Sequence, residues 1–151
     1  MRKKKNQIIV GSITCLAEIG ILLAGTLGVS LSEKNIFYFW GLTMLIPALF
    51  AVVYGIVISK KNKMSEVIWK IIPVTIILAA SACSSMFYMY HGGYISDMVI
   101  NTKTGNGVVL NVNDSISIGS VIQMILVLFV CALAGSAVGN KLTGMMSKIR
   151  N

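Results

Sequence analysis

Apolar residues fall into four long blocks that are separated by short polar connections. Each block is 23 or 24 residues long. A helix of that length reaches ~35 Å, enough to cross a hydrocarbon core of ~30 Å. Backbone N–H and C=O groups find no water in lipid, so a spanning segment must be helical. The pattern predicts an all-α integral membrane protein, a four-transmembrane-helix up-down bundle that forms a single membrane domain over residues 1–151. The predicted helices are about Ile8–Leu31, Ile36–Ile58, Val67–Tyr90 and Ile116–Gly139.

The connections between the blocks differ in length. Ser32–Asn35 and Ser59–Glu66 are short, which makes successive helices antiparallel neighbours. The outer loop, residues 91–115, has room for structure of its own. It places an Asn-Gly pair between two apolar runs, at Val99-Ile100, Gly105-Asn106-Gly107 and Val108-Val109-Leu110. Because Asn-Gly between apolar runs signals a hairpin turn, we predict a small extracytoplasmic β-hairpin between the third and fourth helices.

Composition and charge agree with a bilayer environment. The chain is 56% hydrophobic and 12% charged, whereas soluble domains carry ~25% charged residues. Its net charge of +8 comes from cations that flank the apolar blocks, a distribution that argues against nucleic-acid binding. Eleven Lys and Arg residues lie on one predicted side and two on the other. The positive-inside rule therefore predicts that both termini are cytoplasmic. The excess of Lys over Arg, alongside many Ile and Asn residues, favours an AT-rich bacterial genome. We therefore expect the protein in the cytoplasmic (inner) cell membrane of a bacterium.

Glu18 is the acidic residue that lies deepest in an apolar block. It stands ten residues into the first helix, hence ~15 Å from its start and near the bilayer midplane. An acid there costs about 2.5–3.5 kcal/mol on insertion scales, so it is expected to face other helices and not lipid. The candidates for hydrogen bonding to it or for lying at its depth are Thr14, Thr43, Pro47, Thr75 and Ser81. Pro47 belongs to this set because it withholds a backbone donor from the carbonyl of Thr43.

Two interpretations of Glu18 remain open. In the first, the carboxyl takes up and releases a proton or binds a cation during transport. In the second, it is a hydrogen-bonding residue that holds helices together or contacts a partner protein. A water-accessible cavity around Glu18 favours transport, and dry packing favours interaction.

Small residues at four-residue spacing mark two helix faces. Gly20, Ala24 and Gly28 form one row on the first helix, and Gly135 and Gly139 form another on the last. Such rows allow close backbone approach, which drives helix association in lipid. They are interpreted as packing surfaces, either within the subunit or between subunits.

Motifs for catalysis, phosphate binding or metal coordination do not occur in the sequence. We therefore expect no enzyme activity, no cofactor and no metal. The expected function is that of a non-enzymatic accessory or interaction subunit of a membrane assembly; the alternative is a small proton- or cation-coupled transporter that uses Glu18. Its expected partners are the lipid bilayer and another membrane protein or a second copy in a homodimer.

Two short stretches resemble known families. Ala17-Glu18 in the first helix resembles the small multidrug resistance transporters, whose first helix carries an essential acid in an Ala-Glu pair. This resemblance implies a dimer of four-helix subunits. The layout of four spans with Ser32-Glu33, Lys60-Lys61 and the segment Ala134–Leu142 resembles small uncharacterised membrane proteins of Gram-positive bacteria. That family has no assigned activity, so this likeness implies the fold alone, and the long outer loop departs from both families.

Overall fold

The computed structural model describes residues 2–59, 64–106 and 118–149. These residues form helices and no strand. In chain order the elements are α1 (Arg2–Leu27), the 3-10 turn η1 (Leu31–Glu33), α2 (Ile36–Trp40), the π-helical turn η2 (Gly41–Leu45), α3 (Ile46–Ser59), α4 (Met64–His91), α5 (Tyr94–Asn106) and α6 (Ile118–Ile149).

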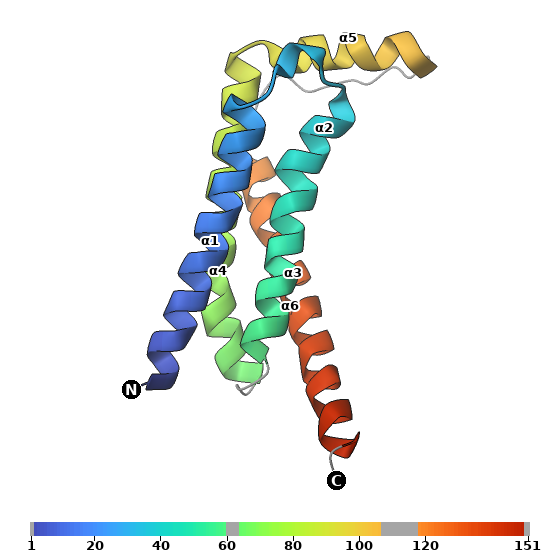
Figure 1. The fold of residues 1–151 in the computed structure, drawn as a ribbon. Helices are drawn as coiled ribbons and strands as arrows, with labels where there is room; N and C mark the ends of the chain where they lie inside the picture. Colours follow the sequence, from blue (N-terminus) through green and yellow to red (C-terminus); the bar gives the residue numbers. More distant parts are fainter. Residues whose placement is uncertain (1, 60–63, 107–117, 150–151) are drawn as a thin grey trace.

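Four stretches in the described part of the chain are long and apolar enough to cross a membrane, as the sequence predicts. They are Asn6–Leu27, Ile36–Ser59, Ser65–His91 and Ile118–Met145. Figure 1 shows them running alternately up and down, so that both termini lie at the same end, which we call the basal end. The helix limits differ from the apolar blocks: α1 ends at Leu27, and α6 continues ten residues beyond Gly139. A helix satisfies its own backbone, so it can continue past the point where the sequence turns polar.

The α4 helix contacts each of the other three long helices, α1, α3 and α6. Its buried residues recur at every third or fourth position from Val67 to Met89. That spacing places them on one face of a helix, where they form the core.

The closest helix contact joins α3 and α6. Each helix contributes a row of small residues: Ala51, Gly55 and Ser59 on α3, and Ala132, Gly135, Ser136 and Gly139 on α6. A Cβ atom added at Gly135 would meet the carbonyl oxygen of Val52, and one added at Gly139 would lie 2.7 Å from that of Ile56. The two glycines singled out on the last helix thus lie where the backbones approach most closely.

The second span contains a π-helical turn directly before Pro47. Proline has no backbone N–H and cannot bond to the carbonyl four residues earlier. The turn from Gly41 to Leu45 is wider than an α-helical one, and the backbone N–H of Ile46 donates to the carbonyl of Gly41. Such a bulge re-aims the helix at a point where its regular bonding is interrupted.

The predicted β-hairpin is wrong for the residues that the structure describes, since Val99-Ile100 lies within α5. Of the rest of that prediction, Val108-Val109-Leu110 lies outside the described residues. Ile95 and Met98 are buried, whereas Asp97 and Ile100 are exposed. This is helical periodicity and not the alternation of a strand. As Figure 1 shows, α5 lies across the end of the bundle opposite the termini, where it contacts η1, α2 and α4.

Candidate functional site

Glu18 lies in the contact between α1 and α4 and is completely buried. The Ser81 hydroxyl of α4 donates a hydrogen bond of 2.6 Å to its Oε2 atom. Its Oε1 atom is buried and has no hydrogen-bond partner among the described residues. The carboxyl therefore faces the bundle, as expected for an acid at this depth, but only one of its oxygens is bonded to the protein.

Ser81 has three acceptors within reach of its single hydroxyl proton. Besides Glu18, they are the carbonyl oxygens of Leu78 at 2.9 Å and Ile77 at 3.1 Å. A hydroxyl donates one hydrogen bond and can accept two. Ser81 can therefore donate to a carboxylate, or it can accept from a protonated carboxyl while donating to its own helix. The contact between Glu18 and Ser81 is compatible with both protonation states.

The other predicted neighbours bond within their own helices. Thr14 donates to the carbonyl of Val10 at 2.9 Å, and Thr43, which is fully buried, donates to that of Phe39 at 2.7 Å. Pro47 is also buried in the bundle. Thr75, which is also fully buried, donates to the carbonyl of Ile72 at 2.9 Å. The structure thus brings Ser81, but none of the three threonine hydroxyls, into hydrogen bonding with Glu18.

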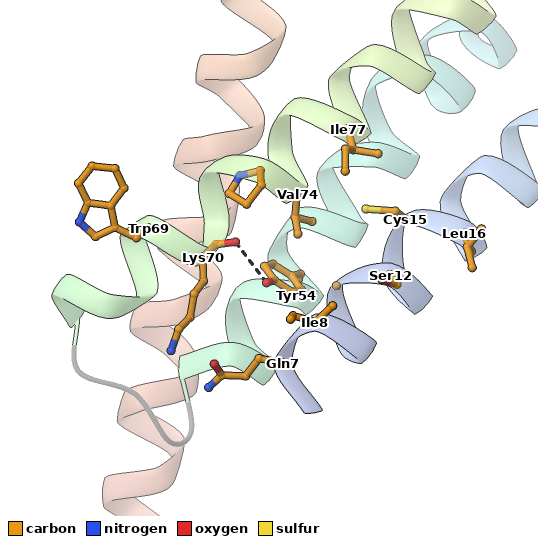
Figure 2. Close-up of a pocket in the computed structure, with 12 residues that line it drawn as sticks. Gln7, Ile8, Ser12, Cys15, Leu16, Tyr54, Trp69, Lys70, Val74 and Ile77 are labelled. Atoms are coloured by element: carbon orange, nitrogen blue, oxygen red, sulfur yellow. Dashed lines mark hydrogen bonds between the residues drawn. The ribbon is translucent and has the colours of Figure 1, made fainter. Parts of the chain in front are cut away.

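A lateral groove of about 710 Å³ opens between α1 and α4 on the basal side of Glu18. We call it the basal groove. Its walls come from α1 between Gln7 and Leu16 and from α4 between Trp69 and Ile77, with Tyr54 of α3 between them (Figure 2). The hydroxyl of Tyr54 donates to the backbone carbonyl of Lys70 at 3.2 Å.

A second hollow, of about 340 Å³, lies between the same two helices on the other side of Glu18. We call it the distal hollow; α1 lines it between Ile19 and Leu27, and α4 between Ser81 and Tyr88. The basal groove ends at Leu16, and the distal hollow begins at Ile19. The hydrogen bond between Glu18 and Ser81 therefore lies between two hollows on the same helix–helix contact.

The small-residue row on α1 behaves differently from the row on α6. Gly20, Ala24 and Gly28 are exposed, and a Cβ atom added at Gly20 would have no atom beyond its own stretch of helix within 4 Å. Gly28 lies just past the end of α1 at Leu27, so the predicted row is helical only at Gly20 and Ala24. Instead, α1 packs through Gly25, whose backbone carbonyl accepts a 2.8 Å hydrogen bond from the hydroxyl of Tyr38. Among the described residues, the row Gly20–Ala24–Gly28 is thus not used for helix packing.

The sequence interpretation missed several residues that shape this region. Tyr54 and Lys70 both line the basal groove. The sequence could have indicated both residues, since the tyrosine lies within one apolar block and the lysine within another. Polar groups at such positions need a protein partner. Likewise, Ala51, Gly55 and Ser59 repeat the four-residue spacing that marked the last helix.

Metal-binding side chains do not cluster in the described residues: no three of His, Cys, Asp and Glu lie together there. The site is a carboxyl buried between two helices that are candidate membrane spans, and one of its oxygens has no partner among the described residues. Comparison with known proteins found no matching family model, no similar curated protein and no similar solved structure.

Proposed function

We propose that this protein is a non-enzymatic accessory or interaction subunit of an assembly in a bacterial cell membrane, with both termini in the cytoplasm. The exposed face of α1 at Gly20 and Ala24, continued by Gly28 directly after the helix, would receive a partner helix. The observation that carries the proposal is that this face, although spaced for close packing, has no neighbour at Gly20 among the described residues.

The physical case rests on how helices associate in lipid. Without a hydrophobic force between helices, association depends on close van der Waals packing, which small residues at four-residue spacing allow. The α3–α6 contact of this same chain uses that principle at Gly55 and Gly135. A row of the same kind on the exposed face of α1, unused among the described residues, supports a second helix contact made with another polypeptide.

The test is recovery of partners after mild extraction of the tagged full-length chain from its native membrane. Gly20→Leu fills the row on α1, and Gly144→Leu is the matched control, since Gly144 on α6 also has open space around it. We expect the wild type and Gly144→Leu to co-purify the same membrane protein in fixed proportion and Gly20→Leu to lose it. A wild-type chain that purifies without any stoichiometric partner would contradict the proposal.

A second candidate function is proton- or cation-coupled transport through Glu18. It is favoured by the unpartnered Oε1 atom and by the two hollows that approach Glu18 from either side along α1 and α4. In this view the hydrogen bond to Ser81 separates two half-pathways, and its rearrangement would connect each in turn to one side of the membrane.

Transport is tested in proteoliposomes that carry a proton gradient and a trapped pH-sensitive dye. If this function is correct, the wild type dissipates the gradient and Glu18→Gln does not, while Thr143→Ala remains active. Thr143 is a suitable control because it lines neither hollow and its hydroxyl bonds to the carbonyl of Gly139 in its own helix. Loss of partner recovery in Glu18→Gln, without any proton flux in the wild type, would instead favour the accessory function.

A further inference from the structure

The basal groove has the shape of a binding site for one lipid chain. Its residues on α1 extend from Gln7 to Leu16, which is ~14 Å along a helix. Half of a ~30 Å hydrocarbon core is about 15 Å. The groove therefore follows the depth of one leaflet, from the membrane surface at the basal end to the level just below Glu18.

The walls of the groove are mostly apolar, and its polar groups gather at the basal end. Ile8, Leu16 and Ile77 line it and are also exposed to the surroundings of the bundle. Gln7 and Lys70 line the same groove, and Figure 2 shows both side chains extending toward its basal end. An apolar slot with a few polar groups at one end is the usual form of a site for an amphiphilic ligand.

The surroundings of the groove favour a lipid as its occupant. Exposed apolar residues line the groove on both helices, where the hydrocarbon of a bilayer would contact them. An acyl chain is thin and flexible, so it can follow an apolar slot between two helices. Since the groove opens laterally, such a chain can enter directly from the bilayer.

The charge at the basal end selects the headgroup. Lys70 lies on the rim, and the turn of α1 that directly precedes Gln7 carries Arg2, Lys3, Lys4 and Lys5. The opposing charge is Glu66, which pairs with Lys70 at 3.4 Å and is more exposed than it. The sequence directly before Gln7 is thus strongly basic, and basic segments at the membrane surface attract anionic lipids, as do basic pockets between transmembrane helices.

We propose that the basal groove binds one anionic phospholipid from the leaflet at the basal end, with an acyl chain between α1 and α4 and the headgroup phosphate at Lys70. Lysine reaches such a position because its aliphatic stem lies along apolar surface while its ammonium group stays at the headgroup level. The exposed ring of Trp69 stands beside it, at the depth where aromatic residues gather. A bound lipid would also cover the exposed side chains of Leu16 and Ile77.

The experiment is native mass spectrometry of the full-length protein in mild detergent, titrated with palmitoyl-oleoyl phosphatidylglycerol or with phosphatidylcholine of the same acyl chains. We expect one phosphatidylglycerol to bind more tightly than phosphatidylcholine. Lys70→Gln should weaken binding of the anionic lipid about fivefold, the effect of one cation near the membrane surface. Lys141→Gln is the matched control, because Lys141 is exposed on α6 away from the groove. Equal affinity for the two lipids in the wild type would overturn the proposal.

Two further variants separate the groove from general attraction to basic residues. Ser12→Phe fills the groove from α1, whereas Ala17→Phe places the same ring on an exposed position that does not line it. We expect Ser12→Phe to lose the tight site for both lipids and Ala17→Phe to keep it. Glu66→Gln removes the competing carboxylate and should tighten binding of phosphatidylglycerol by about two- to fivefold. Unchanged binding in Ser12→Phe with an unchanged helical spectrum would place the lipid elsewhere and refute the assignment.

Discussion

Gly55→Ala adds one methyl group at the point where α3 and α6 lie closest. A Cβ atom at this position would meet the carbonyl oxygen of Ala132 and would lie 2.9 Å from both the carbonyl carbon of Ala132 and the backbone nitrogen of Ser136. Carbon atoms in good contact are about 3.5–4.0 Å apart. Because the opposing atoms belong to a helix backbone and not to a flexible side chain, the two helices must move apart by roughly 1 Å.

The expected loss of stability follows from that displacement. A gap of 0.5–1 Å forfeits about a quarter to a half of the dispersion energy of each contact along the interface, and overpacking of this kind typically costs about 1–3 kcal/mol. The destabilisation by Gly55→Ala should lie at the upper end of this range, since the α3–α6 contact is the most extensive in the bundle. The higher helix propensity of alanine offsets at most about 1 kcal/mol of it. The net effect is a loss of about 2 kcal/mol, or roughly 30-fold in the ratio of folded to unfolded protein.

The measurement is reversible unfolding in mixed micelles of a mild detergent and sodium dodecyl sulfate, followed by far-ultraviolet circular dichroism. Gly20→Ala is the matched control, because a methyl group at Gly20 enters open space. It should leave the stability of the isolated subunit unchanged or raise it by up to about 1 kcal/mol. If Gly55→Ala unfolds at the same detergent fraction as the wild type, the α3–α6 backbones are not in contact at this residue and the reasoning is refuted.

Three further changes test other contacts by the same unfolding measurement. Ser81→Ala leaves both oxygens of Glu18 without a protein partner, so it should lower the free energy of unfolding by about 1–3 kcal/mol. The control Ser84→Ala should be nearly neutral, and equal effects of the two variants would exclude a stabilising bond at Glu18. Tyr38→Phe removes the hydrogen bond to the α1 backbone and should cost about 1 kcal/mol, and a loss near zero would mean that this bond does not hold α1. Met98→Ala, at a fully buried position of α5, should cost about 2–5 kcal/mol; an unaffected midpoint would mean that α5 does not pack on the bundle.

The length and spacing of the apolar blocks determined the four helical spans. This follows from the bilayer itself, since a segment of that length has no structure other than a helix in which its backbone is satisfied in lipid. The bilayer also explains why the Glu18 side chain faces the other helices, because an acid near the midplane is too costly to leave facing hydrocarbon. Both conclusions depend on residues within one helix, so a single sequence contains the information for them.

Which helices pair, by contrast, was decided by tertiary structure. Rows of small residues occur on α1, α3 and α6, and spacing alone cannot say that α3 meets α6 while the row at Gly20, Ala24 and Gly28 stays exposed. Pairing depends on the complementary shapes of two surfaces that lie far apart in the chain. The choice of Ser81 as the partner of Glu18, ahead of Thr14 and Thr43, has the same origin.

The segment after α4 shows how a local signal can be overridden. Its Asn-Gly pair favours a hairpin turn, yet residues 94–106 form a helix whose buried residues Ile95 and Met98 lie one turn apart. The end of the bundle offers an apolar surface to which one helical face can pack, and that burial is worth more than a local turn preference. The helical spans that the bilayer requires could be predicted from the sequence. The contacts between elements could not, because they depend on surfaces that meet only in the tertiary structure.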